Sequence, residues 1–163
     1  MHDSAYKFVQ KMLTMLPSRK SVVEFGSRNV NGSVRQLFKD AEQYIGVDLR
    51  EGPGVDVVAN ASLWHDNGRR FDTVVTTEML EHAPDNGKII ANVLRLLKPR
   101  GVFLLTAATD PRHPHSAIEG GDLRPGEYYK NVNLEELCQS LSAFYFSLVD
   151  TSVTGDVYAL AVK

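Results

Sequence analysis

Two acidic residues and a glycine turn are the first features of the sequence that point to chemistry. Glu24 and Gly26 end a short apolar segment, and Asp48 ends another one, 22 residues after Gly26. A glycine turn that opens a helix brings backbone amides close to an anionic group. A carboxylate about 20 residues further on can accept hydrogen bonds from both hydroxyls of a ribose. The pair therefore predicts a nucleoside site, although the glycine turn alone also fits an ordinary strand-to-helix connection.

Alternating strands and helices must position these residues. Apolar runs of strand length alternate with segments in which apolar residues recur at helical spacing. This alternation is typical of βαβ units, which form a parallel sheet covered on both faces. The expected elements are a helix at 4–16, a strand at 21–25, a helix at 32–39 capped by Asn31, strands at 44–48, 55–58 and 71–77, a helix at 87–97 and a strand at 101–106.

The C-terminal region departs from this alternation. Asn133 is the expected N-cap of a helix at 133–142, and only a short loop separates two β-like segments, 143–150 and 157–163. So short a connection indicates a hairpin, and hence an antiparallel strand. The predicted fold is one α/β domain over residues 1–163. It is a Rossmann-like, doubly wound, seven-stranded sheet, mostly parallel with an antiparallel C-terminal hairpin strand, in three αβα layers.

Composition narrows the class of protein. The chain has 163 residues, of which 43% are hydrophobic and 23% charged, and this suits one globular domain. Its formal net charge of −2 gives no general attraction to nucleic acid, so no such partner is expected. No apolar run approaches the ~18 residues of a membrane span, and the N-terminus lacks the order of a signal peptide, so a cytoplasmic protein is expected. The one cysteine, Cys138, is expected to be a buried thiol.

A long connection lies at 107–132 and is rich in Pro, Gly, His and charged residues. It leaves the carboxyl end of the strand at 101–106, where ligands bind in open α/β sheets. A connection of this length in a compact domain is usually functional or mobile. We therefore expect it to border the binding site.

Several motifs, in this order, resemble the class I S-adenosylmethionine (SAM)-dependent methyltransferases, in particular methyltransferase type 11. Residues 21–106 carry the resemblance closely and the rest loosely. The combination and order are more specific than any single motif. The motifs are Val23-Glu24-Phe-Gly26-Ser27, Ile45-Gly-Val-Asp48, Val57-Val-Ala-Asn60-Ala61, Phe71-Asp72-Thr-Val-Val-Thr-Thr77-Glu78-Met79-Leu-Glu81-His82 and Val93-Leu-Arg95-Leu-Leu-Lys98-Pro99-Arg-Gly101.

The resemblance implies SAM as the cofactor and S-adenosylhomocysteine (SAH) as its product. In this family an acid at the position of Glu24 lies near the cofactor ammonium group, and an acid at that of Asp48 binds the ribose. The residues that the resemblance assigns to the cofactor are Glu24, Gly26, Ser27, Gly32, Asp48, Leu49, Asn60, Ala61, Thr77, Glu78 and Met79.

Two positions depart from the family pattern. The first loop lacks the usual third glycine and carries Arg28-Asn-Val-Asn in its place. Asn60 stands where the family commonly has Asp, and its side-chain amide is expected to accept a hydrogen bond from the adenine amino group.

Three histidines are candidates for proton transfer. Methyl transfer from a sulfonium needs alignment of the acceptor rather than a covalent nucleophile. A hydroxyl acceptor must also lose a proton, and histidine is the usual base near neutral pH. His82, His113 and His115 are therefore the predicted catalytic residues, although His82 also fits a loop-stabilising role and the other two fit solvated loop residues.

The acceptor is an unidentified small molecule or glycan that would receive the methyl group on oxygen or nitrogen. Tyr128 and Tyr129 resemble the aromatic segment that borders the acceptor pocket in relatives, and Arg112 could meet an anionic acceptor group. The domain has little room for a cap over the pocket. We therefore expect the pocket to be open or to be completed by a second copy or another subunit.

Three alternatives stay open. The first is a metal-assisted RNA 2′-O-methyltransferase, because Glu78-x-x-Glu81-His82 resembles the metal-binding motif of small-RNA terminal 2′-O-methyltransferases and of some ubiquinone-pathway O-methyltransferases. No metal is expected, but if a divalent cation binds, these three residues would hold it, completed by His113 or His115. A non-catalytic binding or scaffold protein with the same fold is the second alternative. The third, an NAD-dependent oxidoreductase, is disfavoured because the G-x-G-x-x-G pattern and a separate substrate domain are missing.

Overall fold

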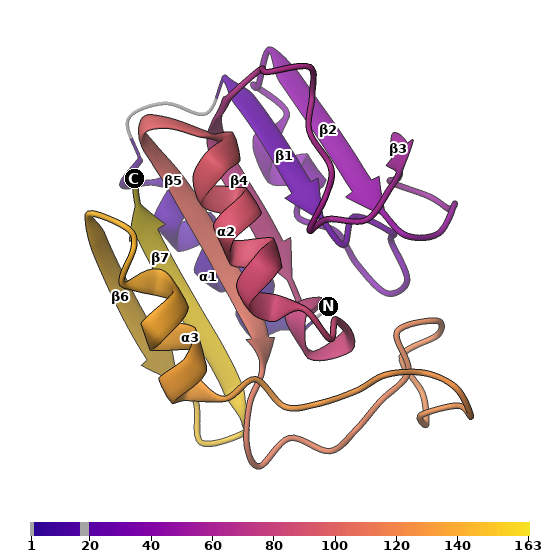
Figure 1. Ribbon diagram of the computed structural model, residues 1–163. Helices are drawn as coiled ribbons and strands as arrows, with labels where there is room; N and C mark the ends of the chain where they lie inside the picture. Colours follow the sequence, from indigo (N-terminus) through magenta and orange to yellow (C-terminus); the bar gives the residue numbers. More distant parts are fainter. Residues whose placement is uncertain (1, 17–19) are drawn as a thin grey trace.

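A seven-stranded sheet forms the centre of the computed structural model, which describes residues 2–16 and 20–163 (Figure 1). The strand order is β3-β2-β1-β4-β5-β7-β6. The first five strands of this order are parallel, whereas β7 runs antiparallel to both β5 and β6. This arrangement confirms the mostly parallel sheet with an antiparallel hairpin. The strands are β1 (Ser21–Phe25), β2 (Gln43–Asp48), β3 (Val57–Val58), β4 (Phe71–Thr77), β5 (Leu97–Ala108), β6 (Phe146–Thr151) and β7 (Asp156–Val162).

Helices cover both faces of the sheet, as the three-layer prediction requires. On one face lie α2 (Asn86–Leu96) and α3 (Leu134–Leu141), and α1 (Asp3–Leu13) lies on the other (Figure 1). Two short 3₁₀ helices, η1 (Arg35–Phe38) and η2 (Leu80–His82), complete the described helical elements. Each face has its own apolar cluster, one packed under α2 and α3 and the other under α1 and η1.

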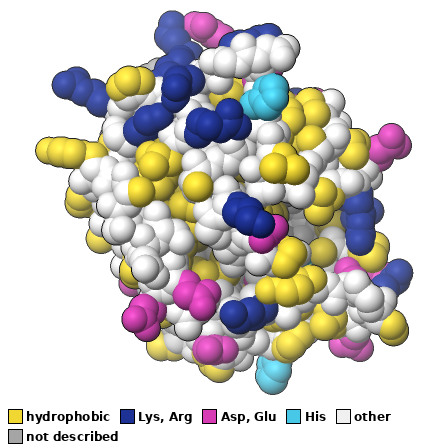
Figure 2. All heavy atoms as spheres, in the orientation of Figure 1, with side chains coloured by type: hydrophobic (Ala, Val, Ile, Leu, Met, Phe, Trp, Pro, Cys, Tyr) yellow, Lys and Arg dark blue, Asp and Glu magenta, His cyan; other side chains and the backbone are white. Residues whose placement is uncertain are grey.

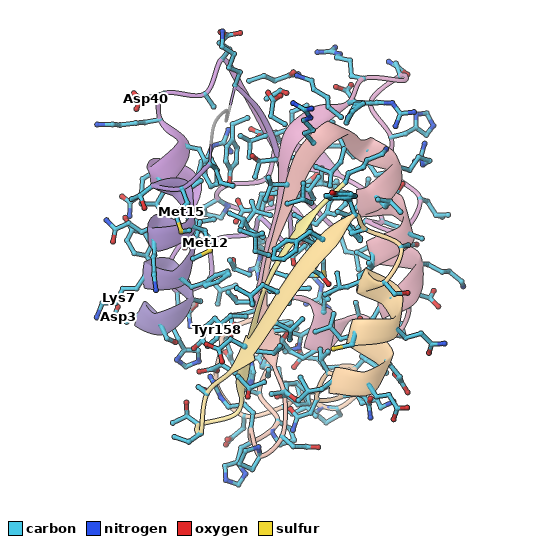
Figure 3. All side chains as sticks on the ribbon, turned by 90° about the vertical axis from the view of Figure 1, so that its left-hand side faces the viewer. Asp3, Lys7, Met12, Met15, Asp40 and Tyr158 are labelled. Atoms are coloured by element: carbon cyan, nitrogen blue, oxygen red, sulfur yellow. The ribbon has the colours of Figure 1, made fainter. Side chains whose placement is uncertain are left out.

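The amphipathic pattern of α1 explains its place in the fold. Val9, Met12 and other apolar residues of this helix are buried against the sheet. Asp3 and Lys7 lie one turn apart on the opposite side and form an exposed ion pair of 3.8 Å (Figure 3). The exposed pair contributes little, so α1 is stabilised mainly by burial of its apolar face.

Local signals set the ends of α2 and α3. Asn133 caps α3 as predicted, because its side-chain oxygen accepts a hydrogen bond from the Glu136 amide at 3.0 Å. At the end of α2, Lys163 donates to the carbonyl oxygen of Leu94 at 2.7 Å, and Arg70 donates to that of Arg95. Figure 2 shows Lys and Arg side chains gathered at this upper end of the molecule. Cations suit the carbonyl-rich end of a helix, so the local positive charge has a structural explanation.

The predicted helix at 32–39 is the main error in the first half of the chain. The structure has only the single turn η1 there, and Asn31 does not cap it, because Val34 precedes η1. Instead, the Asn29 side-chain oxygen accepts a 2.8 Å hydrogen bond from the amide of Gly32. Such a local side-chain bond competes with helix formation. The backbone therefore stays irregular up to Ser33.

Other boundaries differ by a few residues. The helix expected at 4–16 ends at Leu13, where the Thr14 hydroxyl donates to the carbonyl oxygen of Lys11. The strand expected at 55–58 is only Val57–Val58, because it is the outermost strand and pairs on one side alone.

Cys138 is exposed on α3 rather than buried. Over the described ranges, no helix has the length and apolar character to cross a membrane.

Candidate functional site

One cavity of about 720 Å³ lies at the carboxyl ends of β1, β2 and β4. Figure 1 shows the loop after β5, in orange, running below these strand ends. The cavity walls include every residue predicted to bind the cofactor and all three predicted histidines. From the acceptor prediction, Arg112 and Tyr128 also line it, whereas Tyr129 does not. These lining residues are Glu24, Gly26, Ser27, Gly32, Asp48, Leu49, Asn60, Ala61, Thr77, Glu78, Met79, His82, Arg112, His113, His115 and Tyr128.

The glycine turn after β1 packs directly against the start of η2. Gly26 has a φ of +77°, and a Cβ built on it would lie 2.5 Å from Cγ of Met79. Any side chain at this position would meet both backbone strain and a steric clash. Its amide donates to the carbonyl oxygen of Val47 at 2.9 Å, which ties the turn to the end of β2. Only glycine suits this close approach between two walls of the cavity.

Asp48 is held by the backbone at the end of β2. One carboxylate oxygen accepts a 3.1 Å hydrogen bond from the amide of Arg28, and the other accepts a 3.0 Å bond from the amide of Arg50. A carboxylate has about four lone-pair positions, so each oxygen can still accept a hydroxyl. The geometry therefore orients Asp48 and leaves it able to bind a ribose.

Glu24 is a buried acid with one prominent partner. Its carboxylate accepts a 2.7 Å hydrogen bond from the hydroxyl of Tyr44. Arg35 lies 4.8 Å from the centre of the Tyr44 ring and forms a 2.9 Å ion pair with Asp56. Burial raises the pKa of Glu24 to about 7, and the Tyr44 hydrogen bond and the Arg35 charge lower it in part. Glu24 thus changes charge near neutral pH.

Asn60 holds the turn after β3 and also lines the cavity. Its side-chain oxygen accepts hydrogen bonds from both the amide and the hydroxyl of Ser62, at 2.9 and 2.8 Å. These two bonds hold the turn after β3 and occupy the oxygen that was expected to meet an adenine amino group. Asn60 and Ala61 line the cavity, but the predicted adenine bond is untested.

Glu78 has an unusual backbone where β4 ends. Its φ is +52°, which is uncommon for a residue with a side chain. Its amide donates to the carbonyl oxygen of Thr106, and one carboxylate oxygen accepts from the Thr106 hydroxyl, both at 2.9 Å. Neighbouring β5 thus holds this residue at the cavity wall next to Thr77 and Met79. Strained conformations of this kind cluster at functional sites.

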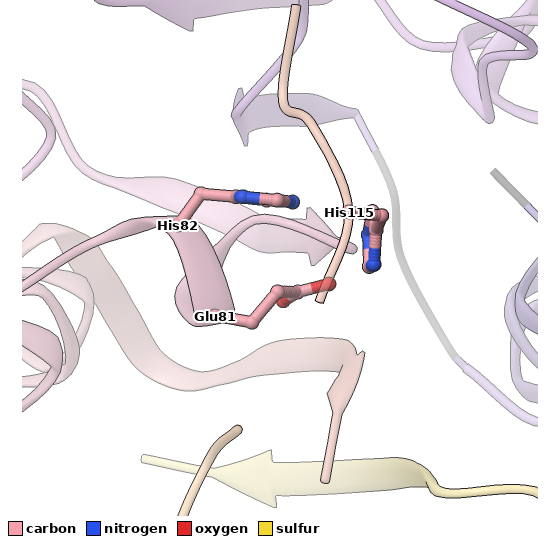
Figure 4. A group of neighbouring side chains, drawn as sticks. All are labelled: Glu81, His82 and His115. Atoms are coloured by element: carbon pink, nitrogen blue, oxygen red, sulfur yellow. The ribbon is translucent and has the colours of Figure 1, made fainter. Parts of the chain in front are cut away.

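A cluster of ligand-type side chains lies beside the cavity. Glu81 and His82 come from η2 and His115 from the loop after β5, and the three side chains converge (Figure 4). Their ligand atoms all lie within 4.8 Å of one another. Of the residues suggested for a divalent cation, this group contains Glu81, His82 and one of the two completing histidines, His115. Glu78 lies outside it. His113 is exposed and lies outside the group.

Burial controls the charge of this cluster. It raises the pKa of the Glu81 carboxyl, and the charge of Glu78 raises it further. Neither Glu81 oxygen has a hydrogen-bond partner of ordinary geometry among the described residues. Burial, together with the neighbouring His115, lowers the pKa of His82 to about 4. At neutral pH His82 is therefore an uncharged and weak base, so the structure does not favour it for proton transfer.

Arg112, which was predicted to meet an anionic acceptor group, already has a partner within the protein. Arg112 forms an ion pair with the buried carboxylate of Asp156 at the start of β7. Tyr128 is exposed at the cavity wall, whereas the Tyr129 ring packs against His82 and His115, with ring centres 5.3 and 5.0 Å away. Tyr129 therefore positions the histidines rather than facing the cavity.

Sequence analysis did not predict the contact between Arg28 and Ile118, although it noted that the loop containing Arg28 lacks a glycine. The Arg28 guanidinium donates a 3.0 Å hydrogen bond to the carbonyl oxygen of Ile118, in the loop after β5. The residue that departs from the glycine pattern therefore joins the two sides of the cavity. The partner is a backbone atom 90 positions away, which spacing rules do not detect.

The comparisons with known proteins bear on this site. A family model described as a methyltransferase domain matches residues 1–151. The ubiquinone biosynthesis O-methyltransferase of Actinobacillus pleuropneumoniae serotype 5b (strain L20) is 37% identical over 65 residues. That stretch covers 40% of this chain and only 27% of the relative.

Two solved structures share the fold. A SAM-dependent methyltransferase from Mesorhizobium loti is 15% identical, with a TM-score of 0.70 and 99% of both chains covered. The 1,6-didemethyltoxoflavin-N1-methyltransferase of Burkholderia thailandensis, crystallised with 1,6-didemethyltoxoflavin and SAH, is 21% identical with a TM-score of 0.65, covering 99% of this chain and 77% of that one. The family model covers most of the sequence. The chain therefore belongs to the methyltransferase-domain family.

Proposed function

We propose that this protein transfers the methyl group of SAM to an oxygen or nitrogen atom of a small-molecule or glycan acceptor. The observation that carries the proposal is the meeting of Glu24 and Asp48 in one cavity, at the edge where parallel strands end. One acid suits a ribose and the other an ammonium group, and SAM carries both. Membership of the methyltransferase-domain family supports the same reaction class.

In this proposal each part of SAM has a partner among the lining residues of the cavity. Asp48 binds the ribose hydroxyls, and Glu24 faces the ammonium group. The amides of the turn after Gly26 meet the carboxylate, since exposed backbone N–H groups favour an anion. Thr77, Glu78 and Met79 then border the sulfonium. This assignment places the transferable methyl toward η2 and the loop after β5.

The reaction is an in-line displacement. A lone pair of the acceptor forms the new bond to the methyl carbon, the carbon–sulfur bond breaks, and its electron pair stays on sulfur as SAH leaves. The acceptor proton passes to a base in the cavity, and His113 and His115 are the candidates once His82 is disfavoured. Alignment of the two reactants can supply about 7–11 kcal/mol of the barrier.

The acceptor side favours a small polar molecule over RNA. Arg112 pairs with Asp156, and Arg124 pairs with Glu119 at 2.8 Å, so neither guanidinium is free to neutralise a phosphate backbone. A second recess of about 310 Å³ shares Pro84, Asp85 and Tyr128 with the main cavity. This recess gives room for a polar extension of the acceptor, such as a sugar.

Calorimetry with SAM, SAH and NAD tests the cofactor side. We expect SAM and SAH to bind and NAD not to bind, and absence of binding to both SAM and SAH would overturn the proposal. Turnover is tested by SAH release with panels of hydroxyl, amine and glycan acceptors and with a short RNA. Binding of SAM without SAH release in every panel would favour a non-catalytic binding protein instead.

A further inference from the structure

The hydroxyl of Tyr44 holds the carboxylate of Glu24, although sequence analysis gave Tyr44 no role. Glu24 lies on β1 opposite Gly46 of β2, and Tyr44 lies two residues before Gly46. Side chains two apart on a strand point to the same face. Glu24 and Tyr44 therefore face the same side of the sheet, and the hydroxyl reaches the carboxylate at 2.7 Å. On the other side of β1, the residue opposite Glu24 is Val75 of β4, which offers no polar side chain.

The ring of Tyr44 is itself held by its neighbours. Arg35 of η1 lies over the ring, with its guanidinium carbon 4.8 Å from the ring centre. The Phe38 ring packs against the Tyr44 ring, with the ring centres 5.6 Å apart. Arg35 is in turn fixed by a 2.9 Å ion pair with Asp56 and by a 3.1 Å hydrogen bond to the carbonyl oxygen of Gly54. The position of the Tyr44 hydroxyl is therefore set by packing around the ring.

We propose that Tyr44 is a positioning residue for the cofactor: its hydroxyl holds one oxygen of Glu24 and keeps this carboxylate ionised, so that the other oxygen can bind the ammonium group of SAM. Glu24 is only 2% exposed, and burial without a hydrogen bond favours the neutral form of an acid. A neutral carboxyl group cannot balance an ammonium charge. The consequence for SAM rests on the proposed function, whereas the bond between the two side chains does not.

The charged groups around Glu24 leave this task mainly to the hydroxyl. Burial raises the pKa of Glu24 to about 7, and the Tyr44 hydrogen bond is the largest of the effects that lower it. Arg35 lowers this pKa as well, whereas Asp48 and Asp56 raise it. Burial and the nearby Glu24 raise the pKa of Tyr44 above its usual value, so the hydroxyl stays protonated and remains a donor. Loss of this one bond should therefore move Glu24 toward its neutral form.

Tyr44→Phe removes the hydroxyl and keeps the ring, so it tests the proposal through SAM binding measured by calorimetry from pH 6 to pH 8. A hydrogen bond to a charged group is strong enough to change the pKa of Glu24 by about 1. SAM binding to Tyr44→Phe should then be roughly tenfold weaker than to the wild type at pH 6, and only about twofold weaker at pH 8. Comparison at the same pH cancels any titration of SAM itself. The matched control is Tyr145→Phe, at a 92% exposed tyrosine outside the cavity, which should bind like the wild type.

Two results would overturn the role of Tyr44. Equal SAM affinities of Tyr44→Phe and the wild type at pH 6 would show that the hydroxyl does nothing for the cofactor. A loss of affinity that is the same at pH 6 and pH 8 would indicate a general structural defect instead. Thermal unfolding checks that the variant folds.

Carbon-13 NMR of the free protein separates this inference from the proposed function. In protein labelled at the glutamate side-chain carboxyl carbon, the Glu24 signal is assigned by its absence from Glu24→Gln. Its titration midpoint should lie about 1 pH unit higher in Tyr44→Phe than in the wild type or Tyr145→Phe. An unchanged midpoint would overturn the link between Tyr44 and Glu24 even if SAM binds. A higher midpoint in a protein that does not bind SAM would support the link and overturn the proposed function.

Discussion

Arg28 joins the two sides of the cavity by donating a 3.0 Å hydrogen bond from its guanidinium to the carbonyl oxygen of Ile118. The backbone amide of the same residue donates a 3.1 Å hydrogen bond to the carboxylate of Asp48. One residue of the turn after β1 thus contacts both the proposed ribose acid and the loop on the acceptor side. Arg28 begins the Arg28-Asn-Val-Asn stretch that stands where a third glycine was expected, and a glycine could not make this link.

Replacing Arg28 by Ala should loosen the loop around Ile118. A hydrogen bond from a charged donor is worth about 1.5–3 kcal/mol, so amide exchange at 116–120 should rise by at least about tenfold. Hydrogen–deuterium exchange measures this, with Arg69→Ala, an exposed pair with Asp66, as the control. Unchanged exchange in Arg28→Ala would mean that the bond to Ile118 does not hold the loop.

Asp48→Ala should weaken SAM binding by about 1–3 kcal/mol, because charge-assisted hydrogen bonds to the ribose are lost. Asp48→Asn should lose less, since the amide oxygen still accepts. Calorimetry with SAM and SAH measures both, and Asp40→Ala on the outer surface serves as the matched control (Figure 3). Equal affinities in Asp48→Ala and the wild type would remove the ribose assignment.

SAM binding should strengthen as pH rises toward 8. Burial raises the pKa of Glu24 to about 7, so this group is mostly neutral at pH 6 and must lose a proton to face the cofactor ammonium. Affinity should therefore be about tenfold weaker at pH 6 than at pH 8. The neighbouring charges are Arg35, Asp48 and Asp56, of which Arg35 favours the ionised form and the two acids oppose it.

The control for this pH dependence is Glu24→Gln, which cannot ionise. Its SAM affinity should be lower at pH 8 and nearly constant between pH 6 and 8. A wild-type affinity that does not change with pH, or a slope that persists in Glu24→Gln, would assign the titration to another group.

Asn133→Ala should lower the free energy of unfolding by about 1 kcal/mol, because the amide of Glu136 loses its cap at the start of α3. Asn133→Ser keeps an acceptor oxygen and should cost only a few tenths of a kcal/mol. Urea unfolding followed by circular dichroism measures both variants. Identical stability of the two would show that the cap contributes nothing.

Strong local signals made most of the fold predictable. The apolar runs at 21–25 and 71–77 became β1 and β4 with the predicted bounds, because a central parallel strand must be apolar on both faces. The N-cap at Asn133 was also predicted correctly, because capping is a local interaction between residues only three positions apart. The prediction of a helix at 32–39 failed because the side chain of Asn29 accepts a hydrogen bond from the backbone amide of Gly32, and this bond competes with the start of a helix.

The residues of the candidate site were also predictable where they end strands, and not where they lie in a loop. Glu24, Gly26 and Asp48 were found from sequence because they end neighbouring parallel strands, and such ends necessarily meet at one edge of the sheet. By contrast, sequence analysis could not tell His113 from His115, or Tyr128 from Tyr129, because neighbours in a loop have no fixed periodicity.

The sequence by itself thus determined the sheet, the family and the strand ends that line the cavity, since these follow from short-range patterns repeated along the chain. Only the tertiary structure decided that His115 joins Glu81 and His82, and that Arg28 reaches Ile118. Both contacts depend on how a long loop folds back over the strand ends. Such packing is set by many weak contacts summed over distant residues, and no local spacing encodes it.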